Sequence, residues 1–125
     1  MAHPIPNIDF EADRFTDILE RNDHYHPYAY ALLMTALREG ETGQRHFSAQ
    51  ELLDCFRELT LDEFGPLSYT VLNAWNVKSC RDIGQMMGLL VETGRVQADE
   101  NDSIDDFTEG FNFEDEFLRI YEGQG

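Results

Sequence analysis

The sequence predicts a mainly α-helical, compact domain of five or six helices that ends in a small β-hairpin. Apolar residues recur at spacings of three and four through most of the chain, which is typical of helices with one buried face. Capping signatures mark two helix starts, and 125 residues is the length of one domain. With 42% hydrophobic residues, the chain can bury a core without metal or disulfide support.

The N-terminal part is predicted to form two helices after a flexible segment over residues 1–8. The first runs from about Asp9 to Arg21, and its apolar face consists of Ile8, Ala12, Phe15 and Leu19. Pro27 suits the first turn of the second helix, which Gly40 ends. Its apolar stripe consists of Tyr30, Leu33, Met34 and Leu37. Residues 41–45 contain no apolar side chain and are expected to form an exposed loop.

The segment 46–96 is expected to hold most of the core. Ser48 and Glu51 form a capping box, and Phe47 can pack onto Leu52 as its hydrophobic staple. This helix continues to Phe64, where the next two residues, Gly and Pro, stop it and start a shorter one. The shorter helix is expected to bury Leu67, Val71, Leu72 and Trp75.

A further helix is predicted to begin at Ser79, because Asp82 completes a second capping box. Gly94 ends this helix, and its buried stripe consists of Ile83, Met87 and Leu90. Residues 95–113 are expected to form the hairpin, and residues 113–121 a C-terminal helix capped by Asn112. A hairpin after these helices also fits a winged-helix architecture, which stays open as the alternative.

The charge of the chain disfavours several classes of partner. Its 25 acidic residues against 9 Lys and Arg give a net charge of -16, which repels nucleic-acid phosphates and anionic membranes. We find no signal-peptide pattern and no apolar run of about 20 residues, so we expect a cytoplasmic protein with no membrane attachment. Cys55 and Cys80 are expected to be reduced, buried thiols.

Metal and catalytic motifs are weak or absent. Residues 99–105 carry oxygen ligands at the alternate positions of a calcium loop, but Ile104 stands where that loop needs Gly and Gly110 where it needs a carboxylate. A solvated turn is therefore favoured. His24 and His26 match no zinc spacing. Because there is also no phosphate-binding glycine loop and no activated nucleophile pattern, we expect no cofactor and no enzymatic activity.

The leading functional hypothesis is a non-catalytic protein-interaction or regulatory domain whose partner is another protein. The alternative is a winged-helix-like nucleic-acid-binding regulator with its recognition helix at residues 79–93. Lys78, Arg81 and Arg95 would then supply the basic contacts, so these three residues are the candidate interaction surface. Three bases among many acids argue against this alternative.

A set of short motifs runs along the chain from about Tyr25 to Phe117. They are Arg45-His46-Phe47-Ser48, Glu51-Leu52-Leu53, Phe64-Gly65-Pro66, Ala74-Trp75, Asp82-Ile83-Gly84, Leu90-Val91, Asp102-Ser103, Asp106-Phe107 and Phe113. In this combination the chain resembles an uncharacterised planctomycete-type family of short bacterial proteins. The resemblance implies no activity and no functional residue. The chain departs from the pattern at Asn76, where the family has Gly, and Asn is the other residue that tolerates a left-handed backbone.

Overall fold

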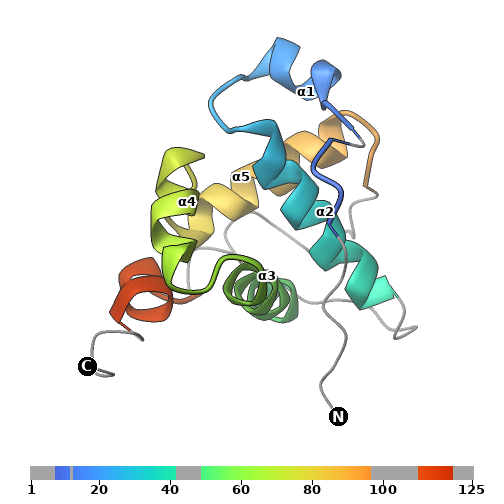
Figure 1. Cartoon of the computed structure of the whole chain (residues 1–125). Coiled ribbons are helices and arrows are strands. Elements are labelled where there is room, and N and C mark those ends of the chain that lie inside the picture. Colours follow the sequence, from blue (N-terminus) through green and yellow to red (C-terminus); the bar gives the residue numbers. More distant parts are fainter. Residues whose placement is uncertain (1–7, 12, 42–48, 97–109, 120–125) are drawn as a thin grey trace.

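A computed structural model describes residues 8–11, 13–41, 49–96 and 110–119 (Figure 1). The elements in chain order are α1 (Thr16–Arg21), α2 (Pro27–Glu41), α3 (Ala49–Phe64), the 3₁₀ turn η1 (Gly65–Leu67), α4 (Ser68–Ala74), α5 (Cys80–Glu92) and the π-helical turn η3 (Glu114–Leu118). The predicted mainly helical class is confirmed. No described residue lies in a strand, and most of the predicted hairpin, 97–109, lies outside the described residues.

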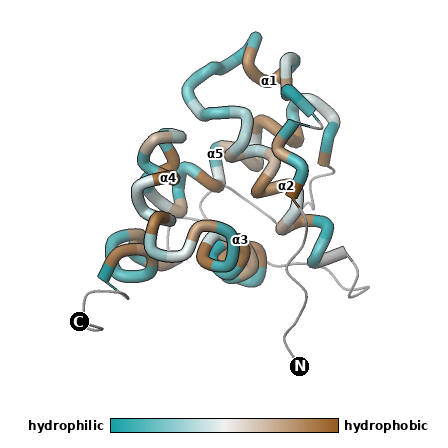
Figure 2. The backbone as a smooth tube through the Cα atoms, viewed as in Figure 1, coloured by the Kyte–Doolittle hydropathy of each residue, from teal (hydrophilic) through white to brown (hydrophobic). Residues whose placement is uncertain are grey.

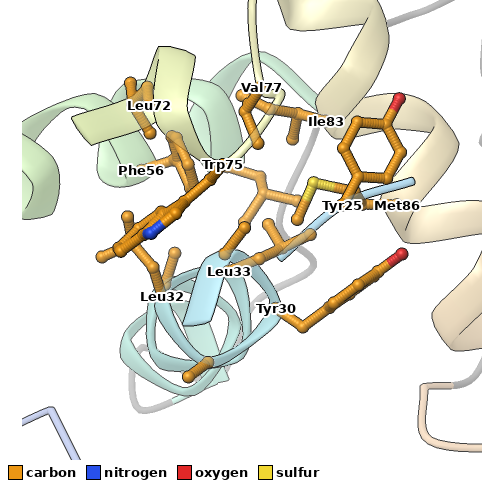
Figure 3. Packing of buried hydrophobic residues seen from close by; sticks show 14 of the residues in the cluster. Tyr25, Tyr30, Leu32, Leu33, Phe56, Leu72, Trp75, Val77, Ile83 and Met86 are labelled. Carbon is orange, nitrogen blue, oxygen red and sulfur yellow. The ribbon is translucent and has the colours of Figure 1, made fainter. Parts of the chain in front are cut away.

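The helices pack around one apolar core. α2 lies against α3, α3 also contacts η1 and α4, and η3 lies beside both α3 and α4 (Figure 1). Figure 2 shows apolar and polar residues alternating around the helices, as expected for elements with one buried face. Figure 3 shows the centre of the core, to which α2 contributes as well as the segment 46–96. The labelled side chains are Tyr25, Tyr30, Leu32, Leu33, Phe56, Leu72, Trp75, Val77, Ile83 and Met86.

The predicted helix from Asp9 to Arg21 is wrong in its first half, since α1 begins only at Thr16. Phe15 has a φ of 53°, in the left-handed region, and this breaks helical continuation. Two local turns precede it: Asp9 Oδ1 accepts from the Glu11 amide at 3.0 Å, and Asp13 Oδ1 accepts from the Phe15 amide at 2.8 Å. Such side-chain bonds satisfy the backbone in place of helical bonds.

The long helix α3 has the predicted limits within one residue. It begins at Ala49, directly after Ser48, and ends at Phe64. Gly65 then takes a φ of 53°, as expected for a helix-ending glycine. Phe47 and Ser48 lie outside the described residues, so the capping box at Ser48 stays a prediction.

The predicted burial of Leu67 is wrong, because its side chain is 63% exposed. The 3₁₀ turn delays α4 until Ser68, and this shifts the register of the buried face to Ser68, Leu72 and Trp75. The buried Ser68 hydroxyl donates to the Gly65 carbonyl at 2.6 Å, or to that of Thr60 at 3.2 Å. Val71, expected in the core, is only half-buried for the same reason.

The capping box at the start of α5 is confirmed. The Asp82 amide donates to Ser79 Oγ at 3.4 Å, and the Ser79 amide donates to Asp82 Oδ2 at 3.1 Å. The buried stripe contains Ile83 and Leu90 as predicted, but Met86 replaces the half-buried Met87. The helix ends at Glu92, two residues before the predicted stop at Gly94, whose φ is 77°.

Asn76 has a φ of 68°, in the left-handed region that asparagine tolerates better than most residues. Its side chain also donates to the His24 carbonyl at 2.9 Å, a bond that Gly could not make. The asparagine therefore ties the turn after α4 to the segment before α2.

The start of the predicted C-terminal helix forms a single wide turn, the π-helical η3. Asn112 Oδ1 accepts from the Asp115 amide at 3.1 Å, as expected for its cap. Phe113 and Phe117 are buried. The predicted continuation to residue 121 falls outside the described residues after Arg119.

Candidate interaction surface

The structure does not gather Lys78, Arg81 and Arg95 on one patch. Lys78 and Arg81 are exposed at the N-terminal end of α5, whereas Arg95 follows its C-terminal end. A helix of 13 residues is about 20 Å long at about 1.5 Å per residue. The two ends are therefore too far apart for these three side chains to form one continuous contact.

Arg95 is engaged within the molecule, in what we call the N-terminal clamp: Arg95 with Asp13, Phe15 and Asp17. Its Nη1 donates to the Asp13 carboxylate, and its Nη2 lies 2.6 Å from Asp17 Oδ1. The guanidinium carbon lies 4.6 Å from the centroid of the Phe15 ring. The hydrogen bonds from Arg95 hold the pKa of both carboxyl groups below the usual range, and the same bonds raise the pKa of Arg95. One of the three candidate bases is thus already neutralised.

The clamp predicts a pH-dependent contribution to stability. Because the pKa values of Asp13 and Asp17 are lowered in the folded state, the clamp stabilises fully above the unfolded value of about 4 and is lost as the pH falls through the folded values. In thermal unfolding, Arg95→Met should have a lower melting temperature than the parent at pH 7. This difference in melting temperature should become smaller towards about pH 2.5.

Lys78→Met is the control for removing one positive charge, because no ion pair involves Lys78 among the described residues. Its melting-temperature difference should be smaller than that of Arg95→Met at pH 7. If the difference in melting temperature between Arg95→Met and the parent stays constant from neutral to acidic pH, the N-terminal clamp does not contribute to stability in this way.

The described residues hold no cluster of three potential metal ligands. The His26 ring stacks on Trp75 at 5.9 Å between centroids, and the His24 ring meets the edge of Tyr25 at 4.7 Å. Both histidines thus have aromatic neighbours. The calcium-like stretch 99–105 lies outside the described residues.

Both cysteines are free thiols. Cys80 is buried as predicted, whereas Cys55 is only half-buried. Burial raises the pKa of the Cys55 thiol to about 11 and also raises that of Cys80. Since the thiolate is the nucleophile, the raised pKa values lower the reactivity of both thiols in the folded protein at neutral pH.

A surface that the sequence did not predict lies on η1 and η3, two turns that both contact α3 and α4. Leu67 is 63% exposed and Leu118 38%, and these are the two exposed large hydrophobic side chains of the described residues. The Tyr69 hydroxyl donates to Glu114 Oε1 at 3.5 Å, which places the start of α4 beside η3 (Figure 1). We call this surface the acidic end; it consists of Asp62, Glu63, Leu67, Glu114, Asp115 and Leu118.

The charge around these leucines is negative. α3, η1 and residues 114–119 carry eight carboxylates and two arginines. Both arginines are paired: Arg57 lies 3.8 Å from Glu116, and Arg119 lies 3.5 Å from Glu114 and 3.6 Å from Asp115. The register shift at Ser68 is what exposes Leu67, and no sequence spacing indicates it.

Among the described residues, the helices are too short or too polar to cross a membrane. No protein-family model matches the chain, and neither the curated proteins nor the solved structures include a significant match to it.

Proposed function

We propose that this protein is a non-catalytic interaction domain whose acidic end binds a partner segment carrying both basic and apolar side chains. The observation that carries the proposal is the exposure of Leu67 on η1 and of Leu118 on η3, two turns that both contact α3 and α4, within a surface rich in carboxylates. Exposed apolar side chains that share one surface are typical of protein contact sites.

The apolar part of the surface would supply affinity. Leu67 is exposed on a turn whose backbone is held by the bond from the buried Ser68 hydroxyl to the Gly65 carbonyl. Burying a leucine side chain stabilises a complex by about 1.5 to 3 kcal/mol. Because the turn is already ordered, little conformational entropy is lost on binding.

The acidic part would supply selectivity. Arg57 and Arg119 are already paired, so the carboxylates of α3 and η3 outnumber any free positive charge there. Such a surface attracts lysine and arginine side chains and repels phosphates. This favours a basic protein segment over nucleic acid.

The test is binding of a short helical peptide with leucines along one face and lysines along the other, followed by fluorescence anisotropy. Leu67→Ser should weaken binding by about tenfold or more, as expected for one buried leucine. Ala74→Ser, an exposed change at the far end of α4, is the matched control and should bind as the parent does.

A peptide with glutamates in place of the lysines should not bind. Equal binding by Leu67→Ser and the parent would place the contact elsewhere and overturn the proposal. Tighter binding to a short DNA duplex than to the peptide would favour the winged-helix-like alternative instead.

A further inference from the structure

We propose that residues 110–119, here called the C-terminal strap, form a detachable element, and that the contact of Gly110 and Phe111 with Cys80 is its latch. Docking of the strap would complete the acidic end, because Leu118, Glu114 and Asp115 belong to the strap. The effect of strap detachment on partner binding therefore rests on the proposed function, whereas the detachment itself does not.

The latch is a close contact between backbone and thiol. The Phe111 amide donates a hydrogen bond to Cys80 Sγ at 3.4 Å. The Cys80 thiol in turn donates a hydrogen bond to the Phe111 carbonyl at 3.4 Å. A single side chain at the first turn of α5 thus pairs with both backbone groups of one strap residue. Cys80 itself is only 3% exposed when the strap is in place.

Gly110 makes this approach possible. A Cβ at this position would lie 2.6 Å from Cys80 Sγ, 3.1 Å from Cys80 Cβ and 2.8 Å from Leu53 Cδ1. The end of the Leu53 side chain could rotate away from such a Cβ. The cysteine is fixed at the start of a helix and by its bonds to Phe111, so the strap itself would have to move.

Outside the latch, the strap is held mainly by three phenylalanines. Phe111, Phe113 and Phe117 pack on one another with ring centroids 5.0 to 5.8 Å apart. Polar contacts between the strap and the rest of the protein include the hydrogen bond from the Tyr69 hydroxyl to Glu114 at 3.5 Å and the ion pair of Arg57 with Glu116 at 3.8 Å. Phe113 is 4% and Phe117 0% exposed in the shared core, so two buried rings must offset the conformational entropy that ten ordered residues lose. A short segment held in this way can open locally before the whole domain unfolds.

The strap and α3 both carry a net negative charge. The strap holds Glu114, Asp115, Glu116 and Arg119, and α3, which it contacts, holds five acidic residues and one arginine. The Arg57–Glu116 pair at 3.8 Å offsets part of the repulsion between them. Repulsion between exposed carboxylates is screened by salt, with a Debye length of about 30 Å at 0.01 M and about 8 Å at 0.15 M. Higher ionic strength should therefore favour the docked strap.

The experiment measures how fast the Cys80 thiol reacts with the uncharged aromatic disulfide dithiodipyridine in a Cys55→Ser background, so that salt does not act by screening the reagent from this acidic protein. The Cys80 thiolate attacks the reagent disulfide, forms one mixed disulfide and releases one pyridinethiolate, which takes up a proton to give the thiopyridone whose absorbance gives the rate. In the otherwise unchanged protein the rate should fall as sodium chloride rises from about 0.01 to about 0.15 M. Gly110→Ala should raise the rate by about tenfold while circular dichroism keeps its helical signal.

Gly94→Ala is the control for a general loss of stability. Its added Cβ has nothing within 4 Å, but the φ of 77° strains any L side chain. This variant should melt lower without a comparable rise in Cys80 reactivity. If Cys80 reactivity instead follows global unfolding in urea, with the same slope, the strap does not detach on its own and the proposal is overturned.

The peptide assay separates this proposal from the proposed function. Gly110→Ala should weaken binding of the leucine–lysine peptide if the strap completes the acidic end. Fast Cys80 reaction together with unchanged peptide affinity would overturn the regulatory role of the strap. Absence of peptide binding in all variants would reject the proposed function, while the thiol rates would still decide whether the strap detaches.

Discussion

Replacing Trp75 with alanine is expected to lower the free energy of unfolding by about 3 to 5 kcal/mol. The side chain is 9% exposed and lies among the rings of Phe10, Phe64 and Tyr28, with centroids 5.5 to 6.2 Å away. Removing it would leave a cavity that these aromatic rings, which come from separate elements, can fill only in part. Urea unfolding followed by circular dichroism measures the loss.

Trp75→Phe is the matched control, since it keeps an aromatic ring and should cost clearly less than the alanine change. Ala74→Ser should be near neutral because Ala74 is exposed. An alanine variant that melts within a few degrees of the parent would show that Trp75 does not anchor the core.

Replacing Tyr30 with phenylalanine is expected to raise the free energy of unfolding by about 1 to 3 kcal/mol. The Tyr30 hydroxyl is fully buried, and no described residue forms a hydrogen bond with it. Burial alone raises the pKa of this phenol to about 12. Deleting the oxygen removes a desolvated polar group at almost no loss of packing, and thermal and urea unfolding measure the gain.

Tyr25→Phe provides the opposite case in the same cluster (Figure 3). The Tyr25 hydroxyl donates to Asp82 Oδ1 at 2.6 Å and lies 2.8 Å from Gln85 Oε1, so its removal should destabilise the protein. A destabilised Tyr30→Phe variant would show that the Tyr30 hydroxyl has a hydrogen-bond partner after all.

Features that depend on neighbouring residues were predictable from the sequence. The capping box of Ser79 and Asp82 involves residues three apart, and the left-handed glycine after Phe64 follows from local backbone sterics. The helix expected from Asp9 failed although its apolar spacing was correct. Phe15 packs beneath Arg95 with a left-handed backbone, and this distant contact has no counterpart in the local pattern.

The candidate surface was less predictable than the fold. Lys78 and Arg81 lie at the start of α5 and Arg95 follows its end. The sequence does not indicate that Arg95 pairs with carboxylates about 80 positions earlier. The acidic end depends on η3 settling beside α4 and on a register shift of one residue at Ser68. Both are consequences of tertiary packing, which residue spacing alone does not encode.

The contacts that α5 and Arg95 make with residues far away in the sequence should slow the folding of the protein. The N-terminal end of α5 bonds to Tyr25, 57 residues earlier, and to Phe111, 31 residues later, while Arg95 beyond its other end reaches 82 residues back to Asp13. Closing such long loops costs entropy before any contact is gained, so helical proteins with these contacts fold more slowly than bundles of sequential neighbours. Substitutions in the N-terminal clamp should accordingly change the unfolding rate and leave the folding rate almost untouched.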